Sequence, residues 1–252
     1  MSLARTEAEL SHDCRGRGRH ALLSTAALGC LLVAGCMTPA INDPARIGPF
    51  FTPINFVGEA NLSADLRRIV LLPVCGGDVA PAETAAALSP VFAAALQRQN
   101  RFEVVTLSRD ECRRRFGVEE ISSTAALPRE IMTILRRDFA ADGVLFVDFT
   151  VFRGYRPLTL GLRAKLAALK DSRLVWSFDT VFSADNPAVA NSARHHFLLS
   201  DGRGVPGDLS PAVLQSPSRF AEYAAAAMFV TLPPVFVPPE PPPAAEAKKP
   251  VR

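Results

Sequence analysis

The spacing of apolar residues changes along the chain, and this change constrains the fold more than any other feature. Residues 68–74 form a short apolar run rich in β-branched side chains. A continuous run of this kind predicts a strand that is buried on both faces. Residues 82–99 then show helical spacing, in which Phe92 and Leu96 lie on one face. A strand followed by a helix of this length favours a crossover connection and therefore parallel pairing.

The alternation of strands and helices continues to residue 152. We expect a second strand over 102–107, and Ser108 and Glu111 have the spacing of a capping box that opens a short helix. A third helix is predicted over 128–141, and Gly143 suits its left-handed C-terminal cap. A long third strand follows over 144–152.

Two later segments alternate between apolar and polar residues with a period of two. They cover 158–168 and 174–182 and predict a β-hairpin with one face on a core. Residues 184–215 are rich in Gly and Pro and predict a loop. A last helix is expected from Ser216 to about Leu232.

The predicted order is therefore β-α-β-α-α-β-β-β-α, which indicates an α/β (α+β) domain over residues 66–232. We expect a mixed sheet of about five strands with helices packed on it. The chain has 252 residues and is 48% hydrophobic and 21% charged, as globular proteins are. Its net charge of +3 does not point to a nucleic-acid partner.

The N-terminal segment has the features of an export signal. Residues 21–35 carry no charge and follow a polar, arginine-containing stretch. As a helix they would measure about 22 Å, which is short for a hydrocarbon core of about 30 Å. The length matches the apolar region of a signal peptide.

The apolar run ends in Val33, Ala34, Gly35 and Cys36, which resemble a bacterial lipobox. The resemblance implies that residues 1–35 are a lipoprotein signal peptide and that Cys36 carries a diacylglycerol anchor with further acyl chains such as palmitate. A plain secretory signal and an uncleaved anchor helix stay open as alternatives. Because Met37 rather than aspartate follows, the resemblance favours the periplasmic face of the outer membrane. Cys30 fits the motif less well.

Two proline-rich stretches flank the predicted domain. Residues 36–65 are interpreted as a lipidated tether, and residues 233–252 as a disordered, polyproline-like tail. The tail holds eight of the twenty-one prolines.

Few residues in the chain suggest catalysis. Cys75 and Cys112 could form a disulfide in an oxidising compartment, or stay buried thiols. The adjacent His195 and His196 converge poorly on a metal. We therefore expect no metal site and no cofactor.

Three further features are candidate sites. Asp148 and Asp179 lie in predicted strands, where a solvent-facing role is more common than catalysis. The Gly76-Gly77-Asp78 turn could cradle phosphate but lacks the motifs of nucleotide sites. Arg153, Tyr155 and Arg156 lie in an expected strand-to-strand loop and form a candidate partner-contact patch, while the arginine clusters at 113–115 and 136–137 are expected on solvated helix faces.

The layout resembles bacterial envelope lipoprotein domains of the CsgG, LpoB and TolB N-terminal type. The segments that carry the resemblance are 69–74, 101–105, 141–147 and 171–177. It implies a non-catalytic adaptor or accessory factor for an envelope complex in cell-wall synthesis, transport or assembly. The partner would be an envelope protein or peptidoglycan. The alternatives are a structural subunit of an oligomeric envelope or secretion machine and an envelope hydrolase; the hairpin at 158–182 completes the sheet and leaves no strands for a CsgG-type pore.

Overall fold

The computed structural model describes residues 44–128, 130–200 and 210–236. The chain divides into two units between Ile47 and Gly48, and the described part of the first unit is the short helix α2 (Pro44–Ile47). The predicted signal peptide, the lipobox residues, Cys36 and residues 237–252 of the tail lie outside the described residues. No helix among the described residues is long and apolar enough to cross a membrane.

The second unit is built on a mixed sheet of six strands within the described residues. The strands are β1 (Phe56–Gly58), β2 (Arg68–Leu71), β3 (Glu103–Thr106), β4 (Gly143–Arg153), β5 (Thr159–Ala168) and β6 (Arg173–Ser183), in the spatial order β1-β6-β5-β4-β2-β3. β2 pairs in parallel with β3 and β4, and the other pairs are antiparallel. The predicted parallel first half and antiparallel hairpin are both confirmed.

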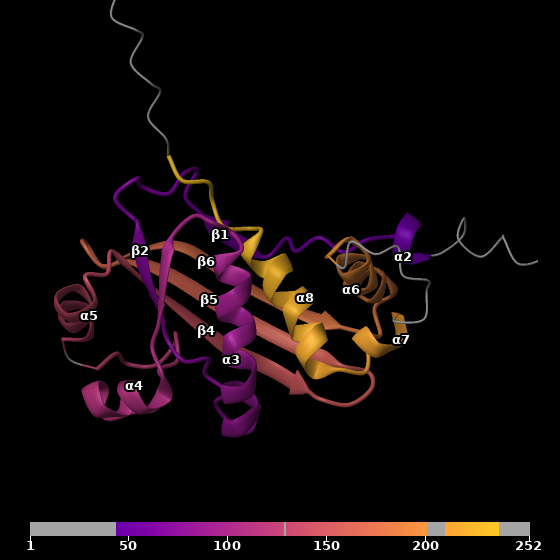
Figure 1. Ribbon diagram of the computed structural model, residues 1–252, viewed down its shortest axis with the longest axis horizontal. Helices are drawn as coiled ribbons and strands as arrows, with labels where there is room; N and C mark the ends of the chain where they lie inside the picture. The colour runs from indigo at the N-terminus through magenta and orange to yellow at the C-terminus, as the bar shows by residue number, and fades with distance from the viewer. Residues whose placement is uncertain (1–43, 129, 201–209, 237–252) are drawn as a thin grey trace, which may run out of the picture. The chain divides into compact units, whose positions relative to one another are not determined.

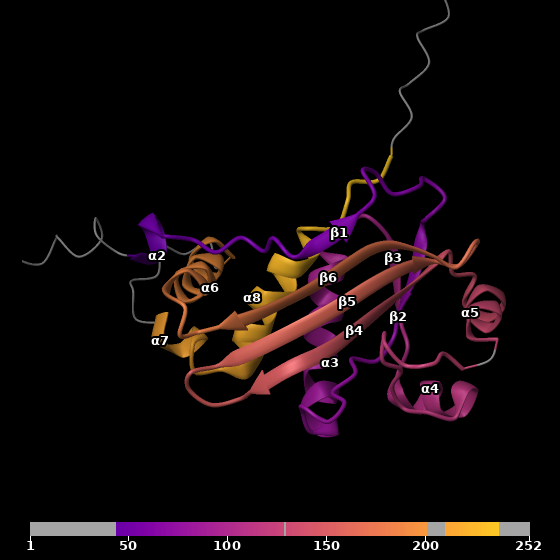
Figure 2. The ribbon, with the colours of Figure 1, turned by 180° about the vertical axis from the view of Figure 1, so that it is seen from behind.

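β2 lies between two hydrophobic cores, as its uninterrupted apolar run predicts. Ile69 and Leu71 belong to the core under α3 (Ala82–Gln97) and α8 (Pro217–Phe229). Val70 and Leu72 belong to the core under α4 (Arg109–Phe116) and α5 (Ile131–Phe139). Figures 1 and 2 show α3 and α8 over one face of the sheet, with α4 and α5 gathered at one end of the long axis.

The helix ends confirm some expectations and correct others. The Ser108 side chain accepts a hydrogen bond from the Glu111 N–H, as in the predicted capping box. The left-handed residue after α5 is Ala140, not the expected Gly143. Gly143 instead begins β4, where an added Cβ would lie 2.8 Å from Leu66 Cδ1 and 3.1 Å from Ile69 Cγ2. This glycine is therefore required by close packing rather than by backbone conformation.

The loop predicted over 184–215 is wrong for its first half, because α6 (Pro187–Ser200) lies there and the short α7 (Ser210–Val213) follows. The sequence carries a start signal for α6 in Asn186 and Pro187. The Asn186 side chain accepts a hydrogen bond from the Ala188 N–H at 2.9 Å, and proline suits a first helical position. The Gly and Pro content of the surrounding segment masks this signal.

The sixth strand, β1, comes from the stretch assigned to the tether over 36–65. Its residues pair with β6 in the register Phe56 with Phe178 and Gly58 with Trp176. Three residues are too few to show a strand period, and Val57 is exposed, so hydrophobic alternation does not predict this strand. The pairing arises from an available sheet edge on β6.

Leu145 on β4 is fully buried, whereas Leu174 on β6 is half exposed. We expect Leu145→Ala to lower the free energy of unfolding by about 2–5 kcal/mol, because it removes buried methyl groups and leaves a cavity. Leu174→Ala, the matched control, should change it by less than about 0.5 kcal/mol. Urea unfolding curves measure both values. Equal losses would contradict the assignment of Leu145 to the core.

Candidate functional site

The carboxyl ends of β2 and β4 form the edge at which open α/β sheets usually bind ligands. Beyond β2 the pairing continues, since the Cys75 N–H donates to the Val147 carbonyl at 2.9 Å and Phe149 N–H donates to the Cys75 carbonyl at 2.8 Å. The connection over residues 117–125, which follows α4, lies against this edge and buries Ile121. The candidate site is therefore occupied by the chain itself.

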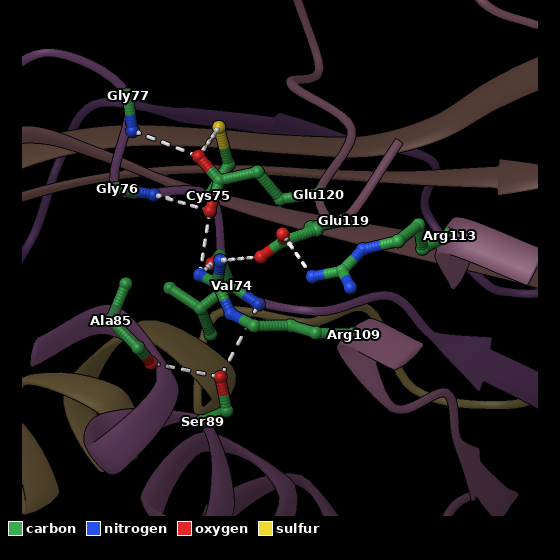
Figure 3. Close-up of polar contacts among 10 residues, drawn as sticks. All are labelled: Val74, Cys75, Gly76, Gly77, Ala85, Ser89, Arg109, Arg113, Glu119 and Glu120. Carbon is green, nitrogen blue, oxygen red and sulfur yellow. Dashed lines mark hydrogen bonds and ion pairs between the residues drawn. The ribbon is translucent and has the colours of Figure 1, made fainter. Parts of the chain in front are cut away.

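The carboxylate of Glu120 is held by several donors at this edge. The N–H groups of Gly76 and Gly77 donate to it at 3.4 and 3.2 Å, and Arg109 Nη2 lies 2.5 Å from it. Figure 3 shows Glu120 between the glycine turn and Arg109. Gly77 has a φ of +51°, a backbone conformation that lets successive N–H groups face one anion. The turn considered for phosphate thus binds a carboxylate of its own chain.

Arg109 connects this carboxylate to the end of β2. Its Nη2 also donates to the Val74 carbonyl at 2.9 Å, and its Nη1 lies 3.8 Å from Glu119. Glu119 in turn bonds Arg113. These contacts join the first turns of α4 to the loop over 117–125, so the arginines of 113–115 are not all solvated as expected.

The pKa of Glu120 lies below its ordinary value. Burial alone raises it, but the Gly77 N–H, the Arg109 guanidinium and the Cys75 thiol together outweigh burial and lower it. A carboxylate that stays ionised and fully bonded in this way fastens the loop. It is a poor proton donor near neutral pH.

Asp148 provides a second attachment for the same loop. Its side chain is buried and accepts hydrogen bonds from Ser123 N–H at 3.0 Å, Ser123 Oγ at 2.6 Å and Ser122 Oγ at 3.3 Å. Lys165 Nζ donates to the Ser123 carbonyl at 2.8 Å. The expected solvent-facing position of Asp148 is wrong, because the loop covers this part of β4. Asp179 is partly exposed and forms an ion pair with Arg163 at 2.8 Å.

Cys75 and Cys112 are buried free thiols in the structure, the second of the two sequence-based alternatives. Burial and the neighbouring Glu120 and Asp148 raise the pKa of Cys75 to about 12. Burial also raises the pKa of Cys112 to about 11, although Arg109 opposes the change. Neither thiol supplies an appreciable thiolate, the reactive form, at neutral pH.

The two histidines lie on α6 and not in a loop. The ring of His195 packs on that of Phe50, with centroids 4.6 Å apart. Burial lowers the pKa of His196. Within the described residues, no three His, Cys, Asp or Glu side chains are grouped as metal ligands.

Arg153, Tyr155 and Arg156 are exposed at the end of β4 and in the loop to β5, away from the Glu120 contacts.

A mostly apolar cavity of about 550 Å³ lies between α3 and the carboxyl ends of β2 and β3. Its lining includes Leu72, Pro73, Ala86, Pro90, Ala93 and Leu107. Pro90 lies inside α3 and has no N–H, so the Ala86 carbonyl loses its usual helical donor. The Ser89 hydroxyl donates to the preceding carbonyl, that of Ala85, at 2.9 Å. The sequence does not predict this cavity; Ser89-Pro90 is the one local feature of its lining that stands out in the sequence.

No family model and no curated protein matches the chain. Among solved structures, the PelC dodecamer from Paraburkholderia phytofirmans is 11% identical, with 69% of this chain and 94% of that chain covered and a TM-score of 0.38. Lipoprotein GNA1162 from Neisseria meningitidis is 17% identical over 54% and 94% of the chains, with a TM-score of 0.39. The LpoB C-terminal domain from Escherichia coli is 16% identical over 46% and 82%, with a TM-score of 0.31. These similarities concern fold alone.

Glu120→Gln should destabilise the protein by about 1–3 kcal/mol at neutral pH, because the substitution weakens several charge-assisted hydrogen bonds. Since the pKa is lowered in the folded state, this stabilisation is present above the ordinary pKa of glutamate. It is lost as the pH falls through the lowered value. Urea unfolding of the natural chain and the variant across this pH range measures the difference.

Glu119→Gln is the matched control, because Glu119 is more exposed and pairs with arginine side chains only. It should cost less than about 1 kcal/mol. A larger effect for Glu119 than for Glu120 would contradict the role of Glu120 in holding the loop.

Both buried thiols should resist alkylation by iodoacetamide in the folded protein and react after unfolding, because their pKa values are raised and their side chains are covered. Peptide mass spectrometry separates Cys75 from Cys112. Rapid alkylation of either residue in the native state, or a peptide pair joined by a disulfide, is the result that this account does not allow.

Proposed function

We propose that the chain is a lipid-anchored protein of the bacterial envelope that acts as a non-catalytic adaptor or accessory factor. One observation carries the proposal: Val33, Ala34, Gly35 and Cys36 follow an uncharged run of signal-peptide length. Residues 1–35 are removed, Cys36 receives the lipid, and the domain extends into the periplasm. Met37 after the cysteine supports the outer membrane as its location.

The non-catalytic part of the proposal is supported by the side chains at the carboxyl edge of the sheet. The Glu120 carboxylate is bonded to Arg109, and the Asp148 carboxylate is bonded to Ser123. The Cys75 thiol has a raised pKa. General acid–base catalysis needs a group that gains or loses a proton near neutral pH within reach of a substrate. The bonded carboxylates fit a structural role better.

The exposed loop between β4 and β5 supports a role in contact with a partner. Arg153, Tyr155 and Arg156 combine charge with an aromatic ring that is 75% exposed. Such residues are frequent at interfaces. This loop would meet another component of the envelope. The adaptor's partner would be an envelope protein or peptidoglycan in a complex for cell-wall synthesis, transport or assembly.

A structural subunit of an oligomeric envelope or secretion machine is the second candidate. It is favoured by the two sheet edges, β1 and β3, which have no further strand partner within the described residues. An open strand edge can pair with another chain. The mass of the detergent-extracted protein distinguishes the adaptor from the oligomeric subunit, because a monomeric mass would contradict the subunit proposal.

Cys36→Ser should abolish labelling by a radioactive fatty acid and release the protein from washed membranes, because serine cannot form the thioether. Cys30→Ser is the matched control in the same apolar run and should leave labelling unchanged. Unchanged labelling of Cys36→Ser, or loss of labelling only in Cys30→Ser, would overturn the assignment of the anchor.

A further inference from the structure

The chain enters the second unit beside α6. The Phe51 N–H donates to Ser192 Oγ at 2.7 Å, and Asn191 Nδ2 donates to the Pro49 carbonyl at 3.3 Å. The ring contact between Phe50 and His195 adds a third attachment. Because residues 49–51 are bonded to α6, any segment that leads from Cys36 reaches this unit at the α6 end.

Exposed apolar and aromatic side chains gather at this end. Tyr155 is 75% exposed, Leu199 is 70% exposed and Phe50 is 43% exposed. Leu199 lies one helical turn after His195 and so on the same side of α6 as Phe50. Together with Arg153, Arg156 and Arg219, these three residues are called the α6-end surface.

The parts of the α6-end surface are continuous. A Cβ added to Gly154 would lie 3.9 Å from Pro217 Cγ, which places the β4–β5 loop at the start of α8. The guanidinium of Arg219 on α8 then lies 5.6 Å from the ring of Phe197 on α6. Figures 1 and 2 agree that α6 and this loop lie at one end of the long axis, and that α4 and α5 lie at the other.

The charge of the α6-end surface favours an anionic partner. Arg153, Arg156 and Arg219 have no acidic partner among the described residues, and Asp185 is the exposed acid that follows β6 nearby. At the opposite end several arginines form ion pairs, as in the pairs of Arg113 with Glu119 and of Arg115 with Asp138. Arginines interleaved with tyrosine and leucine suit the headgroup region of a bilayer.

The chain length between the anchor and the domain limits which surface can reach the bilayer. Gly48 lies twelve positions after Cys36 in the chain. Twelve consecutive Cα–Cα steps extend at most about 40 Å. A domain of this size has a radius of gyration of about 16 Å and therefore a diameter of about 40 Å, which equals the longest reach of this segment. A lipid on Cys36 would therefore keep the end of the domain beside Gly48 closer to the membrane than the opposite end.

Resting on the anchor at Cys36, we propose that the α6-end surface lies against anionic lipid headgroups and fixes the orientation of the domain. The three arginines bind lipid phosphates, and Tyr155 and Leu199 enter the interfacial region. This specifies the partner of the β4–β5 loop as lipid rather than protein. The opposite end, with α4 and α5, then faces away from the membrane and is available to envelope partners.

The test uses the full lipidated protein in vesicles of phosphatidylcholine with and without phosphatidylglycerol. Tyr155→Cys and the matched control Val118→Cys each introduce one exposed thiol for a bimane label, because Val118 is exposed and follows α4. A lipid with a spin label on its headgroup quenches bimane nearby. In vesicles with phosphatidylglycerol we expect quenching at position 155 to be several-fold stronger than at position 118. The double substitution Arg153→Glu and Arg156→Glu should reduce the quenching at position 155, whereas Arg114→Glu should not.

Equal quenching at the two positions, with all variants still floating with the vesicles, overturns the proposal and leaves the anchor intact. Protection of position 155 by a crosslinked envelope protein, without quenching in vesicles, also overturns it and makes the loop a protein contact. Loss of flotation by every variant contradicts the anchor itself, and with it the proposal.

Discussion

The contact between the Glu120 carboxylate and its donors determines how the rest of the candidate site is arranged. It joins the turn after β2, the first residue of α4 and the loop over 117–125 that follows α4. Asp148 fastens the same loop from β4 through Ser123. A buried carboxylate is costly unless it is paired and bonded, so each of these acids specifies a single position for the loop.

This arrangement changes what the carboxyl edge of the sheet can do. In many α/β domains the glycine-rich turn after the first strand holds an external anion. Here Glu120 supplies that anion, so an external phosphate would have to displace a carboxylate that is bonded to Gly76, Gly77 and Arg109. The features that can meet another molecule lie elsewhere, at the predicted anchor, at the α6-end surface and at the sheet edges.

The sequence predicts those parts of the fold that depend on local patterns. β2, β4 and the β5–β6 hairpin follow from apolar runs or strict alternation, and the Ser108 cap follows from a two-residue signature. α6 is missed because Gly and Pro are frequent around it and because Asn191, Ser192 and two histidines interrupt its apolar residues. β1 is missed because only its partner β6 makes it a strand.

The site is less predictable than the fold, for a physical reason. Gly76-Gly77 indicates an anion-binding turn, but the identity of the anion depends on Glu120, which is forty-three positions later than Gly77 in the chain. The spacing of apolar residues predicts local secondary structure and cannot predict a contact between residues so far apart in the chain. The buried position of Asp148 likewise depends on the loop that covers it. The four residues that resemble a lipobox, by contrast, are contiguous in the chain, so the resemblance does not depend on a tertiary contact.

Amide hydrogen exchange at Gly76, Gly77 and Ser123 tests the central claim most directly, namely that two carboxylates close this edge of the sheet with the chain's own loop. Each of these N–H groups donates to Glu120 or Asp148 and lies outside a helix or strand ladder. If the loop is closed, all three should exchange much more slowly than unprotected loop amides. Exchange at the rate of an unstructured peptide at all three positions would show an open edge and contradict the account.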